Sequence, residues 1–304
     1  MITPSTSEDR LPADVRSLYP FTGKMLTLPS GHRMHFLDEG KGDPMLFVHG
    51  NPTWSFYWRR LIGEFSSTNR CVAMDHLGCG LSDKPTDWTY RLEDHVNNLV
   101  ALIEALDLKR ITLVVHDWGG AIGFGAALKL PDRIARIVIF NTGCFEGPIP
   151  WEIRACRLPG VGAVAIRGFN GFVRVGLFRA TSDRSKSKNG VGHGYLAPYD
   201  SWSNRIANLR FVQDIPLEAD HPTRPYFLSV GEGVRKFAHL PVVIVWGEQD
   251  FCFVPAYRKG FIERLPKAEV HVFEDASHWV VEDAHDRIVP ILRDFMARHP
   301  LAAA

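Results

Sequence analysis

Short apolar runs recur along the chain with helical stretches between them, and this alternation most constrains the fold. Runs of four to eight residues that are rich in β-branched side chains and bounded by Gly, Asp or Pro are typical of parallel strands buried on both faces. They lie at 45–50, 71–75, 111–117, 134–141, 241–247 and 268–275. Apolar residues in 91–106, 119–130 and 286–298 instead follow a helical period. The sequence therefore predicts an α/β fold with a mostly parallel, doubly wound sheet.

The alternation stops between about 145 and 235. This stretch is rich in Gly, Pro, Arg and aromatic residues, and it contains a polar run at 181–190. We interpret residues 146–215 as a helical cap inserted between two core strands, with the polar run as a cap loop. Residues 1–145 and 216–304 would then form one core domain, which suits the chain length.

Composition excludes several classes of protein. The 35 Lys and Arg residues nearly balance the 34 Asp and Glu residues, so no basic field indicates nucleic-acid binding. The five cysteines are scattered without a CxxC spacing, which disfavours both a disulfide framework and a zinc site. No apolar run has the roughly 20 residues of a transmembrane helix, and the N-terminus lacks the apolar region of a secretory signal. We expect a cytoplasmic protein without a metal or cofactor.

Asp117 is the first candidate for chemistry. It ends the strand-like run LVVHD, and WGGAIGFGAAL then begins a helix. Gly119 and Gly120 supply the small residues that a tight nucleophile elbow needs, although Val115 replaces the usual leading glycine. An Asp here could merely cap the helix. As a nucleophile, its carboxylate would displace a leaving group from saturated or strained carbon and form an ester.

His278 and Asp250 are the predicted partners of Asp117. His278 follows the last apolar strand, where it can accept a proton from the water that attacks an ester. Asp250 follows the run at 241–247 and would orient the histidine and stabilise the imidazolium. The alternative position for this acid, after the preceding strand, holds Asn141, and Glu248 is a weaker competitor for the role.

Asn51 and Trp118 are the predicted anion-binding residues. Asn51 lies in VHGNPTW, directly after the first long core strand, and Trp118 follows the nucleophile. Their backbone amides would form an oxyanion hole, and the Asn51 side-chain amide and the Trp118 indole N–H are further donors. We expect His49 to have a structural role.

The order HGNP, HDWGG, acid and histidine resembles the haloalkane dehalogenase branch of the α/β-hydrolases, over nearly the whole chain. Asp250 as the acid and Asn51 as the second halide ligand resemble the subgroup called type III. Within it, the cap segments at 166–174 and 195–217 resemble the β-lactone decarboxylases of bacterial olefin biosynthesis. The chain departs from their pattern at 218–235.

This resemblance implies an α/β-hydrolase fold, with Asp117 as nucleophile, His278 as base, Asp250 as acid, and Asn51 and Trp118 binding the leaving anion. It implies conversion of a hydrophobic cis-3,4-dialkyl β-lactone to a cis-alkene and carbon dioxide. It also implies a thiolase-like condensing enzyme and a β-lactone synthetase as partners.

Three other functions stay open from the sequence. The leading alternative is haloalkane dehalogenase, because both reactions expel an anion from carbon. An epoxide hydrolase would need two cap tyrosines, for which Tyr195 and Tyr199 are available. A hydrolase-fold binding protein without turnover is the non-enzyme alternative.

Overall fold

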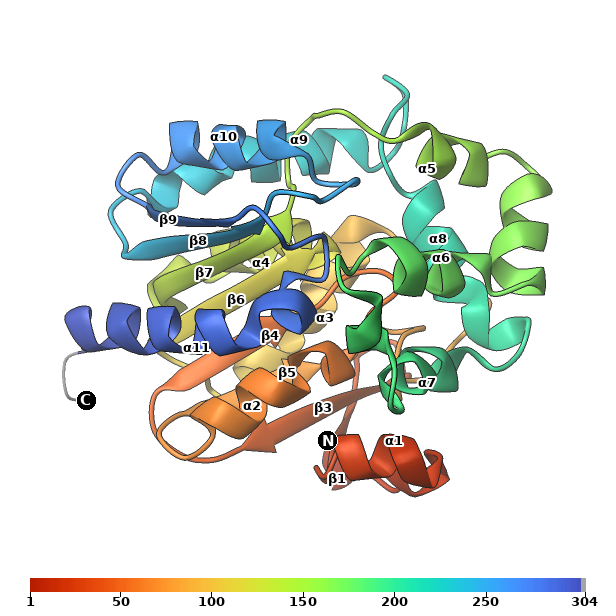
Figure 1. Ribbon diagram of the computed structural model, residues 1–304, viewed down its shortest axis with the longest axis horizontal. Helices are drawn as coiled ribbons and strands as arrows, with labels where there is room; N and C mark the ends of the chain where they lie inside the picture. Colours follow the sequence, from red (N-terminus) through yellow and green to blue (C-terminus); the bar gives the residue numbers. More distant parts are fainter. Residues whose placement is uncertain (302–304) are drawn as a thin grey trace.

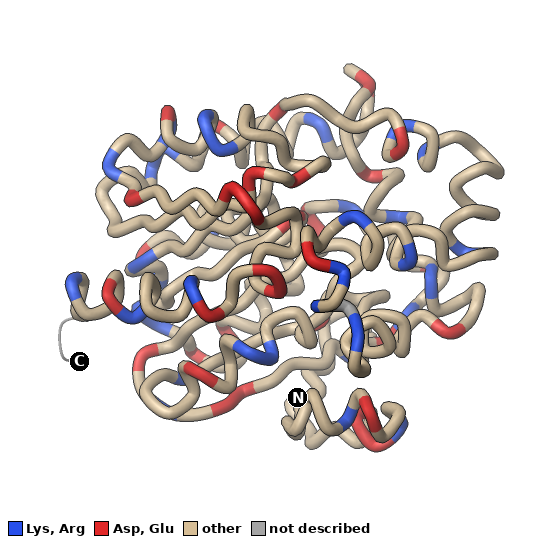
Figure 2. Tube along the Cα trace, viewed as in Figure 1, with Lys and Arg blue, Asp and Glu red and all other residues tan. Residues whose placement is uncertain are grey.

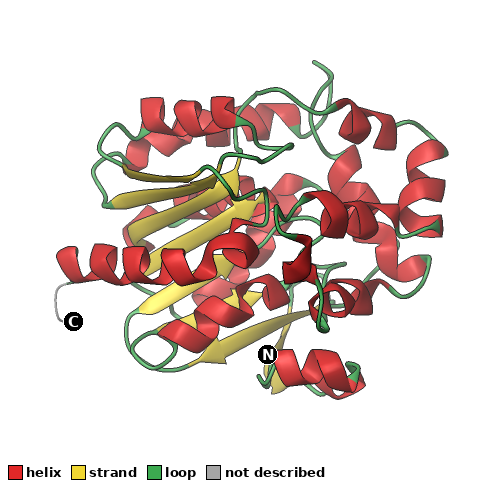
Figure 3. Cartoon of the chain, viewed as in Figure 1, coloured by secondary structure: helices red, strands yellow, loops and turns green. Residues whose placement is uncertain are grey.

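A nine-stranded sheet forms the centre of the molecule in the computed structural model, which describes residues 1–301 (Figures 1 and 3). Its strand order is β1-β2-β3-β5-β4-β6-β7-β8-β9. The last six strands in the chain, β4 to β9, are parallel, and β1 to β3 extend one edge in antiparallel fashion. The strands are β1 (Ile2–Pro4), β2 (Lys24–Thr27), β3 (Arg33–Glu39), β4 (Pro44–Val48), β5 (Arg70–Met74), β6 (Ile111–Asp117), β7 (Ile134–Thr142), β8 (Val242–Gly247) and β9 (Glu269–Phe273).

All six apolar runs of the sequence form strands β4 to β9, which confirms the predicted sheet. The antiparallel strands β1 to β3 were not predicted. They lie toward one edge of the sheet, where one-sided burial and short length leave no continuous apolar run: the residues of β1 are all exposed.

Helices cover both faces of the sheet (Figure 1). On one face lie α2 (Arg59–Phe65) and α11 (Val280–Arg298). On the other lie α3 (Leu92–Ala105), α4 (Trp118–Lys129), α9 (Arg224–Gly233) and α10 (Pro255–Arg264). The remaining core elements are α1 (Ala13–Leu18) and the 3₁₀ turns η1 (Ser7–Arg10), η2 (Ser55–Trp58), η3 (Pro131–Arg133) and η8 (Val234–Phe237).

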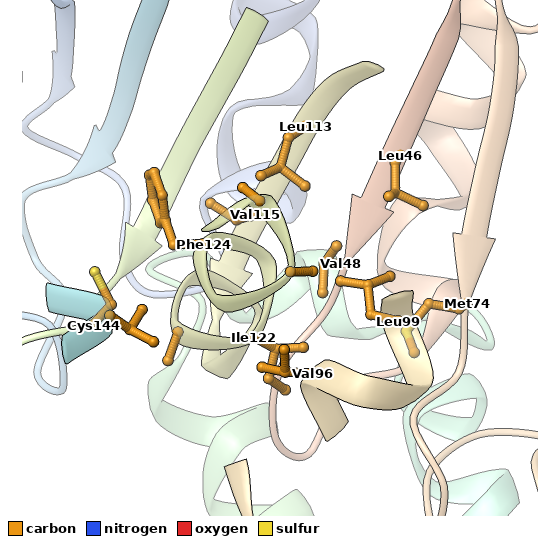
Figure 4. Close-up of a cluster of buried hydrophobic side chains, with 14 of the residues drawn as sticks. Leu46, Val48, Met74, Val96, Leu99, Leu113, Val115, Ile122, Phe124 and Cys144 are labelled. Atoms are coloured by element: carbon orange, nitrogen blue, oxygen red, sulfur yellow. The ribbon is translucent and has the colours of Figure 1, made fainter. Parts of the chain in front are cut away.

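Alternate strand residues fill the two core layers. Leu46 and Val48 of β4, with Leu113 of β6, face α3 and α4 in Figure 4, while Phe47 of β4 packs in the layer under α2 and α11. Val115, which replaces the usual glycine before the nucleophile, has room because α4 carries a glycine opposite it. A Cβ at Gly123 would lie 2.6 Å from the Val115 side chain. The packing at Val115 is therefore close and relies on Gly123.

The segment between β7 and β8 departs from the sheet and is mostly helical. It contains α5 (Trp151–Cys156), the π-helix η4 (Ala163–Gly168), α6 (Gly171–Arg179), η5 (Arg184–Ser187), α7 (Val191–Leu196), η6 (Ala197–Tyr199), η7 (Ser203–Arg205) and α8 (Ile206–Gln213). These lie to the right of the sheet in Figure 1, whereas α9 packs against α3 and α4 of the core. This arrangement supports our proposal that 146–215 form the cap. Within residues 1–301, no helix is long and apolar enough to span a membrane.

Candidate active site

Asp117 occupies a strained turn between β6 and α4. Its backbone has φ 54° and ψ −130°, a conformation that non-glycine residues rarely adopt. The turn depends on glycine at the next positions, because a Cβ at Gly119 would lie 2.0 Å from the Val48 carbonyl oxygen and one at Gly120 would lie 2.0 Å from Thr142 Oγ1. This geometry is that of a nucleophile elbow, which presents the side chain beyond the end of the strand.

One carboxylate oxygen of Asp117 is held by a backbone amide. The Asn51 N–H donates to Oδ1 at 2.6 Å, and a Cβ at Gly50 would lie 1.9 Å from the same oxygen, so this approach requires glycine. The Asp117 pKa is below its usual value: burial raises it, but the hydrogen bond and charge of His278, together with the Trp118 backbone amide, outweigh burial. The carboxylate is therefore ionised at neutral pH.

His278 lies between the two acids. Its Nε2 is 3.5 Å from Asp117 Oδ2, and its Nδ1 donates to Asp250 Oδ2 at 2.8 Å. Burial lowers the His278 pKa, but the negative charges of Asp250 and Asp117 and their hydrogen bonds raise it to about 10. With both carboxylates ionised, the imidazole is therefore protonated.

Asp250 accepts four hydrogen bonds in a buried position. His278 and Asn141 donate to Oδ2 at 2.8 and 2.9 Å, and the amides of Cys252 and Phe253 donate to Oδ1 at 2.6 and 2.9 Å. Burial raises the Asp250 pKa, but the charge and hydrogen bond of His278 and the two amides more than offset it. Asp250 is thus a fixed anion whose orientation the surrounding donors set.

The competing acid and the structural histidine also have defined partners. Glu248 pairs with Arg258 at 3.1 Å rather than with His278. His49 is buried, with Nδ1 2.7 Å from the Gly50 carbonyl oxygen and Nε2 accepting the His76 amide at 3.0 Å. These contacts fit the structural role predicted for His49.

Three residues that contact His278 or Asp250 were not predicted from the sequence to belong to the site. Asn141 donates to Asp250 and also holds β8, because its Oδ1 accepts the Gly247 amide at 2.8 Å. His116 Nε2 donates to the His278 carbonyl oxygen at 2.8 Å, and Phe253 stacks on the His278 ring with centroids 5.5 Å apart. The signal for Asn141 was its place at the end of a strand next to the predicted acid.

Asn51 and Trp118 flank Asp117 in the same cavity. The Asn51 Nδ2 donates to the Asn208 carbonyl oxygen at 3.2 Å, which fixes the side chain against the cap helix α8. The Trp118 ring packs against Phe211 of the same helix, with centroids 5.5 Å apart. The structure therefore brings all five predicted site residues together.

The cavity above Asp117 has a volume of about 250 Å³ and lies between core and cap. Its walls are mainly apolar, and apart from Asp117 itself the charged lining residues are Glu146, Arg154 and Arg224. Arg224 pairs with Glu146 at 2.5 Å. The apolar lining residues include Phe145, Ile149, Ile153, Phe172, Val212, Ile215, Leu217, Phe227 and Phe253. Such a cavity suits an uncharged, hydrophobic substrate. No cluster of metal-ligating side chains occurs among the residues that the structure describes.

The fold and the elbow define the class of protein to which this chain belongs, the α/β-hydrolase family. The model for the alpha/beta hydrolase fold matches residues 43–168 and 180–284.

Two relatives and one solved structure show which members of this family the chain resembles. Cis-3-alkyl-4-alkyloxetan-2-one decarboxylase of Shewanella oneidensis is 42% identical over 92% of this chain and 90% of its own. Haloalkane dehalogenase 2 of Mycobacterium tuberculosis is 32% identical over 89% of this chain and 93% of its own. The haloalkane dehalogenase DatA of Agrobacterium tumefaciens superposes with a TM-score of 0.80 at 26% identity, covering 91% of this chain and 97% of DatA. The resemblances to the haloalkane dehalogenases and to the β-lactone decarboxylases are confirmed, and the relatives are enzymes.

Proposed function

We propose that this chain converts cis-3,4-dialkyl β-lactones to cis-alkenes and carbon dioxide, with Asp117 as the nucleophile. The observation that carries the chemistry is an ionised carboxylate, tethered by one oxygen, at the base of an apolar cavity. The higher identity to the decarboxylase than to the dehalogenases supports the lactone as substrate. An oxetan-2-one with two alkyl chains is uncharged and hydrophobic, as the cavity walls require.

In the first step, Asp117 Oδ2 attacks the saturated, alkyl-bearing ring carbon that is bonded to the ring oxygen, and not the carbonyl carbon. The C–O bond of the ring breaks, ring strain is released, and the ring carbonyl becomes a free carboxylate. Asp117 becomes an ester whose carbonyl oxygen, Oδ1, still accepts the Asn51 amide. In this proposal the Asn51 side chain and the Trp118 indole N–H stabilise the new carboxylate.

In the second step, the bond between the carboxylate and the ring carbon next to it breaks. Its electron pair forms the alkene, carbon dioxide leaves, and the ester C–O bond returns its electrons to Asp117. Neither water nor a proton is consumed, so His278 acts here by orienting and neutralising Asp117. Attack inverts one carbon, so a cis-alkene from a cis-lactone requires the carboxylate and the ester to leave from opposite sides.

Haloalkane hydrolysis is the second candidate. Asn51 and Trp118 border the cavity beside Asp117, where two N–H donors could hold a departing halide. The alkyl ester would then be cleaved by water, with Oδ1 in the oxyanion hole and His278 as general base.

Epoxide hydrolysis has less support. Tyr195 donates to Glu282 at 2.5 Å, and Tyr199 donates to the Thr53 carbonyl oxygen at 3.4 Å. Both side chains are fully buried, and neither belongs to the set of residues lining the cavity. The two cap tyrosines therefore lack the position from which they could protonate an epoxide.

The native substrate is tested by kcat/KM for a dialkyl β-lactone and for a dibromoalkane on one preparation, because this ratio reports transition-state preference. We expect the lactone value to exceed the bromoalkane value by on the order of a hundredfold or more. The Asp117→Asn variant, whose amide cannot attack carbon, serves as the control and should lose both activities. An equal or higher bromoalkane value would instead assign haloalkane dehalogenase activity to this chain.

We also propose a cytoplasmic location, which the five unpaired cysteines support. In the reaction sequence that we propose, this chain acts after enzymes that condense acyl chains and close the lactone ring. The lactone must be supplied by a thiolase-like condensing enzyme and a β-lactone synthetase. Co-purification of these enzymes with the tagged chain from its native cells is the corresponding test.

A further inference from the structure

The π-helix η4 (Ala163–Gly168) separates the cavity from solvent. Its inner residues, Ala163 and Ile166, pack in an apolar cluster with Ile153 and Val212, and these last two line the cavity. Its outer side carries Val164, an apolar residue that is open to solvent.

The outer face of η4 continues into neighbouring aromatic side chains. Val161, Val164 and Gly168 recur at intervals of three and four residues, and Val164 is 54% exposed. A Cβ at Gly168 would lie 3.8 Å from the Trp202 ring and 3.9 Å from the Val164 side chain, so these residues form one surface. Phe169, next in the chain, is 73% exposed. We call Val161, Val164, Gly168, Phe169 and Trp202 the η4 patch.

Exposed apolar side chains are concentrated on this side of the molecule. Eight of the twelve large apolar side chains that are exposed within residues 1–301 lie between 151 and 202. Single exposed apolar residues are ordinary on a protein surface, but a contiguous group marks an interaction site. The η4 patch is therefore a candidate docking surface.

Arginines border the η4 patch. The Arg167 guanidinium lies 4.6 Å from the centre of the Trp202 ring, and Arg205 donates to the carbonyl oxygens of Arg167 and Gly168 at 2.7 and 3.2 Å. Burial and the positive charge of Arg210 lower the Arg167 pKa, so Arg167 and Arg210 repel each other. Arg167 also donates to the Trp202 carbonyl oxygen at 3.0 Å, and Arg210 donates to Gln213 Oε1 at 3.2 Å. Within the described residues, none of these three arginines forms an ion pair with a carboxylate.

The charge of the cap differs from that of the core. Residues 146–215 contain ten Lys and Arg against five Asp and Glu, a net charge of +5, whereas the rest of the chain has a net charge of −4. Figure 2 shows these basic residues spread over the cap. Apolar and aromatic side chains bordered by arginines without a carboxylate partner are the composition of segments that lie in the interface of an anionic membrane.

We propose that the η4 patch docks on a bilayer containing anionic phospholipids. Phe169, Val164 and Trp202 enter the boundary between headgroups and acyl chains, while Arg167, Arg205 and Arg210 contact phosphates. Docking places the cavity one helix away from the bilayer. If the proposed function holds, the dialkyl lactone and the alkene, both lipid-soluble, then pass between cavity and bilayer over a short path.

Co-sedimentation with vesicles tests the docking directly. We expect the full chain to bind equimolar phosphatidylglycerol–phosphatidylcholine vesicles at least about tenfold more tightly than pure phosphatidylcholine vesicles, with affinity falling as salt rises. The Val164→Ser/Phe169→Ser and Arg167→Gln/Arg210→Gln variants should each weaken binding to the anionic vesicles by about tenfold or more.

Matched controls lie on the core. Ile262 and Val270 are exposed apolar residues there, so Ile262→Ser/Val270→Ser should bind vesicles as the unmodified chain does. Lys259→Gln/Lys267→Gln is the corresponding charge control. Thermal unfolding of every variant checks that its fold is retained.

Three outcomes would overturn the docking proposal: no binding to anionic vesicles, equal losses in patch and control variants, or a patch that drives self-association which vesicles do not reverse. Sedimentation requires no turnover, so its result is independent of the proposed reaction. Conversely, a chain that docks but leaves the lactone unchanged would refute the proposed function alone.

Discussion

The proton on His278 depends on the charge of Asp117. While both acids are ionised, their charges hold the His278 pKa at about 10 and the ring stays protonated. Formation of an ester removes the negative charge of Asp117, one of the contributions that raise this pKa, so the ring then loses its proton more readily. The site thus makes a general base available only after the covalent step, when a water-dependent reaction would need it.

His278→Gln should therefore separate the two candidate reactions. With a 1-bromoalkane, we expect an alkyl ester to accumulate on Asp117, because attack needs only the carboxylate whereas ester hydrolysis loses on the order of 10²–10⁴-fold without its base. Intact-mass spectrometry should show the added alkyl group. With a dialkyl β-lactone, which needs no proton transfer in the proposed route, we expect activity within about tenfold of the unmodified chain.

The control for this experiment is the double variant Asp117→Asn/His278→Gln, which should form no adduct. An adduct on that double variant, or none on His278→Gln despite demonstrated binding of the bromoalkane, would contradict attack by Asp117. Loss of lactone turnover to the same extent as bromoalkane turnover would contradict the proton-free route.

At the level of elements, the elbow between β6 and α4 depends on how closely α4 approaches β4. Gly119, the second residue of α4, lies directly against the carbonyl oxygen of Val48, which ends β4. The same approach brings the Asn51 amide to Asp117 Oδ1. The position of the carboxylate is thus set by the packing of a helix on a neighbouring strand.

Gly119→Ala should lower both stability and turnover. Its Cβ would lie 2.0 Å from a backbone oxygen that no side-chain rotation can move, so we expect a loss of about 2 kcal/mol or more in the free energy of unfolding, measured in urea. Gly63→Ala in α2 is the matched control: its Cβ would meet nothing within 4 Å, and alanine favours a helix by about 1 kcal/mol. A Gly119→Ala variant as stable as Gly63→Ala would contradict this account of the elbow.

The sequence predicted those parts of the structure whose signal is local. Strands β4 to β8 are continuous apolar runs because both faces are buried, and the elbow around Asp117 and the position of His278 follow from strand ends. The cap helices were not predicted individually, because they are short and interrupted by Gly and Pro. The hydrogen bond from Asn141 to Asp250 joins residues 109 positions apart, and only the paired strands bring them together.

At the level of the whole molecule, the N-terminal segment is joined to the sheet by a buried charged cluster. His35 lies between two acids, with Nε2 2.7 Å from Glu8 Oε1 and Nδ1 2.8 Å from Asp75 Oδ2. Glu8 also accepts the Gly23 amide at 2.6 Å, and Asp75 accepts the Ser55 amide at 2.7 Å. Breaking such a cluster on one side leaves an uncompensated buried charge.

The titration of this cluster predicts how stability depends on pH. Burial raises the pKa of Glu8, but the hydrogen bond and charge of His35 outweigh it and lower the pKa from 4.5 to about 2. The stabilisation from Glu8 is therefore complete above pH 4.5 and is lost as the pH falls through about 2. Burial lowers the His35 pKa, but Asp75 and Glu8 raise it from 6.5 to about 9, so its stabilisation is complete below pH 6.5 and is lost as the pH rises through about 9.

We therefore expect the contribution of the cluster to be greatest between about pH 4.5 and 6.5 and to decline on both sides. Urea unfolding across this range, compared between the unmodified chain and Glu8→Gln, measures it. The difference in free energy of unfolding should be largest in that window and should shrink as the pH rises through 9, because neutral His35 no longer needs the Glu8 charge. Asp9→Asn, which neutralises the exposed carboxylate of the next residue, should show no such pH-dependent difference. A difference between the unmodified chain and Glu8→Gln that stays constant from pH 5 to 10 would show that Glu8 stabilises the fold by packing and not through the charge of His35.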